Sequence, residues 1–464
     1  METFDVIIIG AGSSGVSAAL RASDNGARVC IIEQDCIGGS SYYKTQQSLK
    51  LGLSLLKNNE SKFRVDGVID SKKLFCEITN ALQSLSQLCE QRLLDSGVTI
   101  QKGMGSLISP EIIQVKSIGQ TYELNAKKII IATGSSPIAL PTVPFEEAII
   151  VSFDDVFKNH DIPKRVFLVG SGDKSCELSV FYQMLGSKVF LSSSQTRLFP
   201  DQDPEIIDAL ENSLKHLKVK LLLGKEISSY YANGESLDIT LSEGVKFQTD
   251  KIIINLNRQG NSEYLKCDTL GVRLGANKEV LVNENLETSV PGIFAVGSIN
   301  GYDRRSGFSE EEGKIAADNA LGKSINVNYD LVPFVVFTDP EIASVGCFAD
   351  QSHHKGFRGV EGCVQLKNLD FSFFCKDNGG FFKIAADARS GMVIGGQIVS
   401  PNASQLISLV VLAIRKGLKV GVLASALSSD KSGEIEGIRE AARLCRNAIR
   451  SVKKKSVNRA NNLS

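Results

Sequence analysis

Three glycines and one glutamate near the N-terminus form the clearest candidate site in the sequence. Gly10, Gly12 and Gly15 follow a run of apolar residues and make a GxGxxG turn. In such a turn the first glycine permits a tight bend, the second lets the backbone approach a pyrophosphate, and the third lets the next helix pack close to the strand. Glu33 stands further along, where a carboxylate can accept hydrogen bonds from ribose hydroxyls. The pattern therefore predicts a dinucleotide-binding turn.

A second, altered copy of this pattern occurs in the middle of the chain. Gly170 and Gly172 follow another apolar run, but the third glycine position is occupied by Ser175. The next apolar run ends in SSSQ, with Ser193 where the acid would stand, and no Arg there marks a 2′-phosphate site. We predict a second dinucleotide fold that either binds its nucleotide weakly or has become purely structural.

These residues need strands and helices to position them. Residues 6–9 are continuously apolar, which indicates a buried parallel strand, and residues 14–22 are small and apolar, which favours a closely packed helix. Residues 28–32 predict a second strand that ends at Glu33. The stretch KIIIATGSSP, residues 128–137, predicts a further buried strand followed by a turn of small residues.

Composition and charge narrow the class of protein. The 464 residues carry 52 Lys plus Arg and 52 Asp plus Glu, a balance that argues against nucleic acid as the main partner. The longest apolar stretch, 406–414, is too short to span a bilayer. The ten cysteines are scattered without CxxC or zinc spacing, so no metal site is predicted. Because the first strand begins almost at once, no targeting segment is expected, and a reducing cytoplasm is the predicted compartment.

From these motifs the chain resembles the flavin-dependent pyridine-nucleotide–disulfide oxidoreductases, most closely the dihydrolipoamide dehydrogenases. The first turn, DVIIIGAGSSG, is followed by the pair Gly38-Gly39 and by Lys50, as in that family. Near the C-terminal third, PFVVFTDPEIASVG resembles the start of the family's dimerisation domain. The resemblance spans residues 3 to about 450. It implies FAD as the cofactor, NAD(P)H as a second and weak ligand, and a homodimer.

The sequence departs from the family where the disulfide chemistry resides. The two redox cysteines of the family fall on Ser41 and Gln46, and neither side chain can form a disulfide or a thiolate. The family's C-terminal His-Pro-x-x-x-Glu places its Glu on Glu436 and its His, the acid/base for the dithiol, on Lys431. An unperturbed Lys is protonated near neutral pH and is a poor base. The resemblance therefore implies a degenerate redox pair and a degenerate base dyad.

What remains near the expected flavin is a charged pair and a set of cofactor contacts. The family pairs Lys50 with Glu177 beside the flavin, where a Lys can stabilise negative charge on the reduced ring. Without the resemblance, Lys50 and Glu177 are equally well interpreted as an ordinary ion pair inherited from an ancestral protein. Ser298 stands where the family has an Asp that bonds a ribityl hydroxyl. By resemblance, the cofactor-binding residues are Gly10, Gly12, Ser14, Gly15, Glu33, Gly38, Gly39, Lys50, Gly105, Thr133, Gly134, Ser298 and Ser306 for FAD, and Gly170, Gly172 and Ser193 for NAD(P)H.

The expected fold class is α/β, with two Rossmann-like FAD/NAD(P)-binding domains plus an α+β dimerisation domain. We expect an FAD-binding domain at 1–145 and an NAD(P)-binding-like domain at 146–262. A central segment, 263–331, returns to the FAD domain. The dimerisation domain is expected at 332–452, with its last helix ending at Ile449, and a disordered basic tail at 453–464.

Two functions follow from the sequence. The first is a flavoprotein without dithiol chemistry that passes electrons from NADH or NADPH to a non-dithiol acceptor such as a quinone. The second is a catalytically silent family member that acts as a structural or binding protein. Reduction of bound flavin by a nicotinamide cofactor separates them.

Overall fold

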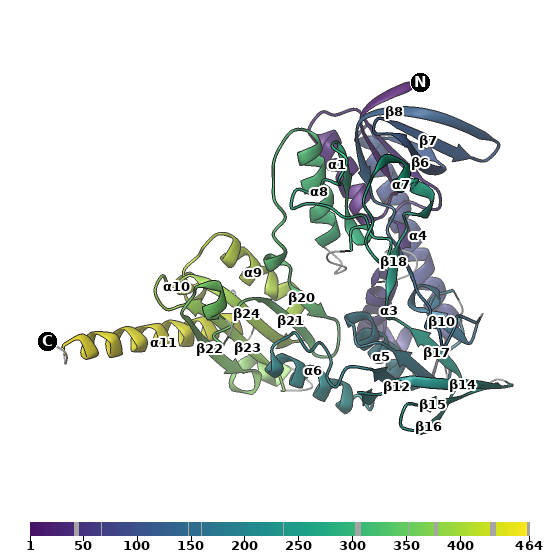
Figure 1. The fold of residues 1–464 in the computed structure, drawn as a ribbon. Helices are drawn as coiled ribbons and strands as arrows, with labels where there is room; N and C mark the ends of the chain where they lie inside the picture. The colour runs from purple at the N-terminus through teal and green to yellow at the C-terminus, as the bar shows by residue number, and fades with distance from the viewer. Residues whose placement is uncertain are drawn as a thin grey trace. The chain divides into compact units, whose positions relative to one another are not determined.

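The computed structural model describes residues 1–40, 46–65, 67–146, 148–158, 160–234, 236–301, 308–350, 352–374, 379–426 and 433–461. They form two compact units, drawn as a ribbon in Figure 1. The first contains Met1–Gly170, Met184–Ser187 and Glu226–Val327, and the second contains Ser171–Gln183, Lys188–Lys225 and Asn328–Ser464. Each unit is described by itself.

The first unit is built on a seven-stranded sheet in the order β5-β2-β1-β8-β7-β6, with β19 paired to β8. Its strands are β1 (Glu2–Ile9), β2 (Val29–Glu33), β5 (Thr99–Lys102), β6 (Met104–Ser109), β7 (Ile112–Ser117), β8 (Gln120–Ile131) and β19 (Ile293–Ala295). β5, β2, β1, β8 and β19 run parallel, and β6, β7 and β8 form an antiparallel meander. Because the carboxyl ends of parallel strands meet at one edge, Gly10 and Glu33 emerge side by side.

Three helices cover one face of this sheet: α1 (Ser13–Asp24), α4 (Ser71–Asp95) and α8 (Phe308–Ala320). Val6 and Ile8 of β1 belong to this core, and the alternate residues of β1 belong to a second core on the other face. The helices α1 and α8 lie side by side (Figure 1). A Cβ added at Gly313 would come within 2.3 Å of the Ser14 carbonyl oxygen, so this close approach requires the glycine.

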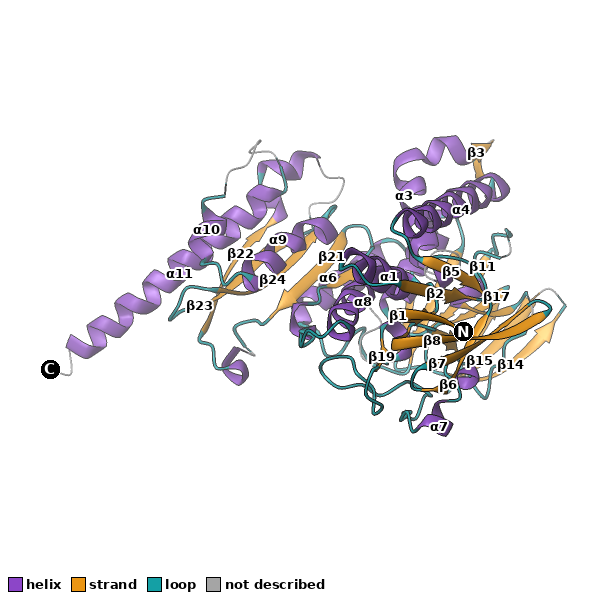
Figure 2. Ribbon diagram, turned by 90° about the horizontal axis from the view of Figure 1, so that it is seen from above, coloured by secondary structure: helices purple, strands orange, loops and turns teal. Residues whose placement is uncertain are grey.

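Smaller elements complete the first unit. They are α3 (Gln46–Asn59), β3 (Arg64–Val65), β4 (Val68–Ile69), β9 (Ser135–Pro137), β10 (Ile150–Ser152), η2 (Phe153–Asp155), β11 (Arg165–Val169), β14 (Ile227–Asn233), β15 (Ser236–Leu241), β16 (Lys246–Thr249), β17 (Lys251–Ile254), β18 (Arg258–Gly260), η3 (Glu263–Leu265) and α7 (Cys267–Leu270). β17 lies in parallel between β10 and β11, while β14, β15 and β16 form a separate antiparallel meander. Figure 2 shows these elements by type of secondary structure.

The second unit contains one parallel strand pair and one antiparallel sheet. Its first elements are α5 (Asp173–Met184), β12 (Lys188–Ser193), α6 (Pro204–His216) and β13 (Lys220–Leu223), with β12 and β13 parallel. The start of α6 is set by Asp203, whose carboxylate accepts a hydrogen bond from the Glu205 N–H at 2.9 Å, followed by Pro204 at the first helical position. The antiparallel sheet has the order β20-β21-β24-β23-β22.

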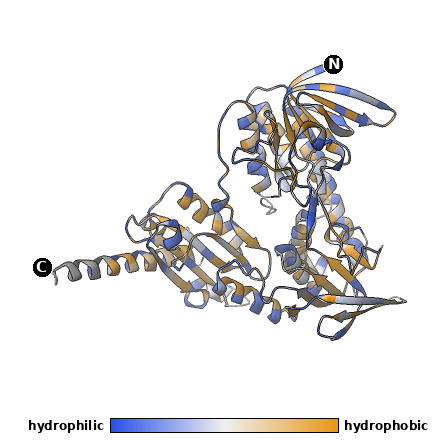
Figure 3. Ribbon diagram, viewed as in Figure 1, coloured by the Kyte–Doolittle hydropathy of each residue, from blue (hydrophilic) through white to orange (hydrophobic). Residues whose placement is uncertain are grey.

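Helices cover one face of the antiparallel sheet. The strands are β20 (Phe334–Val336), β21 (Glu341–Gly346), β22 (Gly359–Gln365), β23 (Phe381–Asp387) and β24 (Val393–Ser400), and the helices are α9 (Ala403–Arg415), α10 (Val420–Ala424) and α11 (Ile435–Asn461). Phe382 and Ile398 of the sheet belong to the same buried core as Ile407 and Val410 of α9. Figure 3 shows the strands of the sheets largely in the hydrophobic colour. Buried apolar strands against amphipathic helices make this the core of the second unit.

The last helix is longer than the sequence indicated. The backbone of α11 continues to Asn461, beyond Ile449, so residues 453–461 of the expected disordered tail are helical here. No Gly or Pro follows Gly437 in this segment, and residues such as Lys, Arg and Ala favour helix, so nothing local stops the helix once its first turns are packed. Residues 462–464 lie outside the described residues.

Candidate functional site

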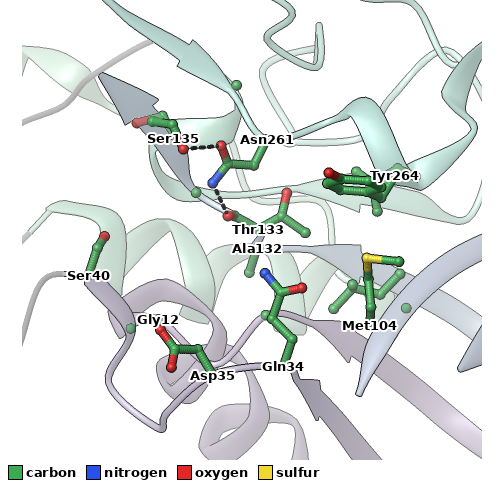
Figure 4. Close-up of a pocket in the computed structure, with 18 of the residues that line it drawn as sticks. Gly12, Gln34, Asp35, Ser40, Met104, Ala132, Thr133, Ser135, Asn261 and Tyr264 are labelled. Carbon is green, nitrogen blue, oxygen red and sulfur yellow. Dashed lines mark hydrogen bonds between the residues drawn. The ribbon is translucent and has the colours of Figure 1, made fainter. Parts of the chain in front are cut away.

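A pocket of about 470 Å³ opens in the first unit at the carboxyl ends of its parallel strands. Its lining includes Gly10 and Gly12 of the first turn, Glu33 at the end of β2, and Thr133 and Gly134 of the turn after β8 (Figure 4). Ligands of open parallel sheets bind at this edge. The pocket therefore joins the sequence motifs that were predicted to bind a dinucleotide.

The three glycines of the first turn have different physical roles. Gly10 has φ +104°, and a Cβ there would lie 2.4 Å from the Ala132 carbonyl oxygen. A Cβ at Gly15 would lie 2.0 Å from the Gly10 carbonyl oxygen, so glycine lets α1 approach the turn. A Cβ at Gly12 would meet no protein atom within 4 Å. Gly12 thus borders open space at the N-terminus of α1, where a pyrophosphate could approach the backbone.

The Glu33 carboxylate is held by two backbone N–H groups. Its Oε2 accepts a hydrogen bond from the Ala11 N–H at 2.6 Å, and its Oε1 accepts one from the Asp35 N–H at 2.7 Å. These bonds fix the carboxylate beside the turn. Each carboxylate oxygen retains further acceptor capacity, which suits ribose hydroxyls in the pocket.

A second glycine pair closes against the first turn. Gly38 and Gly39 have φ +100° and +60°, and the Gly38 N–H donates to the Ala11 carbonyl oxygen at 2.8 Å. A Cβ at Gly39 would lie 3.0 Å from the Gly12 Cα. The close contact depends on the missing side chain at Gly39, and Gly12 and Gly39 both line the pocket.

The turn after β19 also reaches this region. Glu312 on α8 is fully buried and accepts hydrogen bonds from the Gly297 N–H at 2.6 Å and from the Asn300 side-chain amide at 3.2 Å. A Cβ at Gly297 would come within 2.6 Å of the Ser14 Oγ, and a Cβ at Gly134 within 3.8 Å of the Ser298 Oγ. The structure therefore brings Ser14 and Ser298 into the neighbourhood of the glycine turns.

Several residues that line the pocket were not assigned to the site by the sequence analysis. The Asn261 side-chain amide donates to the Thr133 carbonyl oxygen at 2.9 Å (Figure 4). Gln34, Asp35, Ser40, Met104, Ser135, Asp154, Gln259, Tyr264 and Lys278 also line the pocket. The sequence offered one signal for Met104 as a pocket residue, which is its position between Gly103 and Gly105. Asn261 and Tyr264 follow β18, and only the tertiary structure brings them to a turn so distant in sequence.

An ion pair between Arg258 and Asp154, with little solvent exposure, fixes the part of the pocket wall that contains Asp154 and Ser135. The Arg258 guanidinium donates to both carboxylate oxygens of Asp154 at 2.8 and 2.9 Å, and to the Ser135 Oγ and carbonyl oxygen at 2.9 and 2.6 Å. Only 12% of either charged side chain is exposed. A bidentate pair in this setting connects β18, β9 and η2 and holds the turn after β8 in place.

The described residues fit a dinucleotide with adenosine and pyrophosphate parts. Open space at Gly12 admits a pyrophosphate, and the oriented Glu33 carboxylate suits a ribose. Thr133 lines the pocket, and its Oγ1 is buried without a hydrogen-bond partner within the described protein. Because buried polar atoms are nearly always paired, this hydroxyl is consistent with a ligand or water bond.

The remaining predicted residues are placed as follows. Lys50 is exposed on α3, and it does not line this pocket. Glu177, fully buried on α5, accepts a hydrogen bond from the Phe337 N–H at 3.1 Å. The Glu436 carboxylate accepts one from the Arg439 side chain at 2.6 Å. Ser41, Ser306 and Lys431 lie outside the described residues, as does the side chain of Gln46.

The second repeat is divided between the two units at Gly170, which has φ +130°. In the second unit, Gly172 precedes α5, and Ser175 is buried in the first turn of that helix. Ser193 ends β12, is 5% exposed, and its Oγ accepts a hydrogen bond from the Gln195 N–H at 3.1 Å. Strand, turn and helix are therefore present here, with a neutral hydroxyl where Glu33 stands in the first repeat.

The chain belongs to the pyridine nucleotide-disulphide oxidoreductase family. The family match covers residues 4–318, and a match to the dimerisation domain of the same family covers residues 332–429.

Among individual proteins, the chain is 29% identical to a mercuric reductase from Staphylococcus aureus over 446 residues, which are 92% of this chain and 79% of that protein. It is 27% identical to a dihydrolipoyl dehydrogenase from Chlamydia muridarum over 428 residues, covering 90% of this chain and 91% of that protein.

Solved structures show the same fold. The crystal structure of LpdA from Mycobacterium tuberculosis matches with a TM-score of 0.87 at 25% identity, over 96% of this chain and 99% of that one. The HOCl-induced flavoprotein disulfide reductase RclA from Escherichia coli, as its Cu(II) complex, matches with a TM-score of 0.85 at 20% identity, over 96% and 100% of the two chains.

The family confirms two predictions from the sequence. The fold class is α/β, with Rossmann-like nucleotide-binding domains and a dimerisation domain. Members of the family bind FAD and NAD(P)H, which confirms the predicted cofactors. Within the described part of the chain, no helix is long and apolar enough to cross a membrane.

Proposed function

We propose that this protein is an FAD-dependent NAD(P)H oxidoreductase that does not use dithiol chemistry and passes electrons to a non-dithiol acceptor such as a quinone. The proposal rests on the contrast between a complete dinucleotide turn and a replaced disulfide site. The first dinucleotide turn and its Glu33 carboxylate are complete and geometrically ready, whereas Ser41, Gln46 and Lys431 occupy the positions of the family's two redox cysteines and base. Bound FAD would supply two-electron redox chemistry, and the chain would supply the binding site.

In this proposal the FAD-binding domain is 1–145, helped by the central segment 263–331. The NAD(P)-binding-like domain is 146–262. Glu33 would hold the adenine-side ribose, Gly12 and Gly39 would admit the pyrophosphate, and Ser298 would take the place of the family's ribityl-binding Asp. Lys50, in the same unit, would act beside the flavin.

The described cysteines support the absence of a substitute dithiol. The nine that the structure describes are thiols rather than disulfide halves. Burial raises the pKa of Cys30 and of Cys445 to about 12 and that of Cys267 to about 11. Thiolates are the reactive form, so these three thiols are inert near neutral pH.

The proposal is tested by the absorbance spectrum of the purified protein under anaerobic conditions. We expect a flavin spectrum that NADH or NADPH bleaches and that a quinone then restores, while oxidised lipoamide does not. Colourless protein that takes up no added FAD would refute the cofactor part. Flavin that neither nicotinamide nucleotide reduces would favour a silent protein.

A catalytically silent binding protein is the second candidate, and one observation favours it. The Ser193 hydroxyl, where the family has an acid for the nicotinamide nucleotide, is buried and bonded to its own chain. If this half binds no nucleotide, the flavin would have no hydride donor, and FAD would be structural.

NADH is therefore expected to bind weakly, with a dissociation constant above micromolar. Ser175 adds a Cβ where the first repeat needs glycine, and Ser193 offers no charge-assisted bond, which is worth about 1.5–3 kcal/mol. Titration calorimetry with the wild type and with Ser193→Glu checks this, and the variant should bind NADH more tightly. Submicromolar binding to the wild type would contradict the interpretation of the second repeat.

We also propose a homodimer formed through the dimerisation domain. Leu412 of α9 and Val422 of α10 are 51% and 50% exposed, an apolar surface on the elements that the family match assigns to this domain. Leu412→Glu should shift the protein from twice 50.1 kDa toward 50.1 kDa in sedimentation, because a charge would then be buried at the interface. Leu88→Glu, at a leucine of α4 that is 57% exposed, is the matched control and should stay dimeric. A wild type that sediments only as a monomer would refute the proposal.

A further inference from the structure

Tyr264 is an exposed aromatic residue on a firmly anchored segment. Its side chain is 62% exposed although it lines the pocket. On one side, the Ser262 Oγ donates to the Lys278 carbonyl oxygen at 2.8 Å, and Ser262 is 3% exposed. On the other side, Leu265 is buried in the core that also contains Ile32. The backbone that carries the ring is thus anchored on both sides, while the ring itself is exposed.

Met104 lies near this ring and lines the same pocket. The 3-10 helix η3, which carries Tyr264, packs against β6, which begins at Met104. Figure 4 shows the Tyr264 ring beside the Met104 thioether, with the Gln34 amide directed into the same space. Methionine and tyrosine side chains are soft, apolar and polarizable surfaces that suit a flat ring.

The floor between them is bare backbone. Gly103 has φ +152°, and a Cβ there would lie 2.8 Å from the Lys116 carbonyl oxygen. A Cβ at Gly105 would lie 3.1 Å from the Ile9 Cγ2. Neither position has room for a side chain, so the chain on both sides of Met104 is bare backbone, and both glycines line the pocket. The Gly103 N–H donates to the Glu33 carbonyl oxygen at 2.9 Å, which places this backbone beside Glu33.

We propose that Tyr264, with Met104, is a positioning residue that clamps the purine base of the bound dinucleotide. A base has two flat apolar faces and a polar edge. The Tyr264 ring and the Met104 thioether would cover the faces, and Gln34, which carries both a donor and an acceptor, would meet the edge. Glu33, at the same end, would then hold the ribose of the same nucleoside. This inference rests on the proposed FAD site and adds the residues that select its adenosine end.

The test measures binding of FAD to full-length protein isolated without flavin. Tyr264→Ala should weaken FAD binding roughly 5- to 100-fold, since loss of one stacking partner of a base has effects of that order. Tyr264→Phe should bind FAD like the wild type because the ring is retained. Tyr231→Ala removes a tyrosine of β14 that is 69% exposed and does not line the pocket. It is the matched control and should also bind FAD like the wild type.

A second readout separates clamping from a general structural role. The dissociation constant of ADP, which has the adenosine but no flavin, should rise for Tyr264→Ala relative to the wild type by the same factor as that of FAD. The thermal midpoint of the flavin-free protein should be the same for all variants. If Tyr264→Ala binds FAD within twofold of Tyr231→Ala, the inference is overturned while the proposed function stands. If the wild type binds no FAD, both fall.

Discussion

Lipoamide-type disulfides are expected to remain unreduced in an NADH-coupled assay, even where bound FAD is reduced. Thiol–disulfide exchange requires a thiolate that attacks sulfur and a second sulfur that passes the electrons on. Ser41 and Gln46 supply neither. The proton of a substrate thiol also lacks an acceptor, because Lys431 occupies the position of the family's His.

These losses act in series, so restoring one should leave the others limiting. Ser41→Cys with Gln46→Cys should restore a disulfide and still give poor turnover. Adding Lys431→His to that double variant should raise turnover by about 100-fold or more, the usual contribution of a general acid–base group. The assay compares the wild type, the double variant and the triple variant at equal bound flavin. Robust wild-type turnover, with all ten cysteines mapped as unreactive, would show that the mechanism is wrong.

Two alanine substitutions in the first turn should separate binding from folding. Gly15→Ala places a methyl group 2.0 Å from the Gly10 carbonyl oxygen and 3.2 Å from the Ala132 Cβ, and neither the backbone nor this short side chain can rotate away. We expect a loss of about 1–3 kcal/mol or more in the free energy of unfolding, as overpacked cores show. Gly12→Ala meets no protein atom within 4 Å, and its φ of −68° suits alanine. Its methyl group would instead occupy the space in which the pyrophosphate approaches the backbone.

We expect Gly12→Ala to lose FAD affinity and Gly15→Ala to lose thermal stability. Gly12→Ala should unfold at the wild-type temperature without flavin and bind FAD roughly 10- to 100-fold more weakly, the effect of a small steric clash on affinity. Gly15→Ala should unfold at a lower temperature with or without flavin. Thermal melts of the flavin-free protein and FAD titrations measure both quantities. Normal FAD affinity in Gly12→Ala would place the pyrophosphate elsewhere and contradict the proposed site.

Local patterns in the sequence determined the core of the fold. The apolar run before Gly10 became β1, the small residues after it became α1, and the run before Glu33 became β2, because continuous apolar residues and fixed glycine spacings admit few local conformations. The same reasoning also predicted the helix that ends the dimerisation domain, where α11 lies. The sequence analysis ended this last helix too early. Whether a charged, helix-favouring extension becomes helical depends on what the first turns of the helix pack against, which the local sequence does not show.

The sequence alone also determined what this chain lacks, because the absence of cysteine at positions 41 and 46 holds in any fold. Only the tertiary structure decided which distant residues complete the pocket. Asn261 reaches Thr133, Arg258 joins Asp154 to Ser135, and Tyr264 lines the same pocket as Met104. Their sequence neighbourhood is an ordinary polar loop after a short strand, without periodicity or motif. Packing of η3 against β6 gives them their place, since a long-range contact leaves no spacing that a local pattern can reveal.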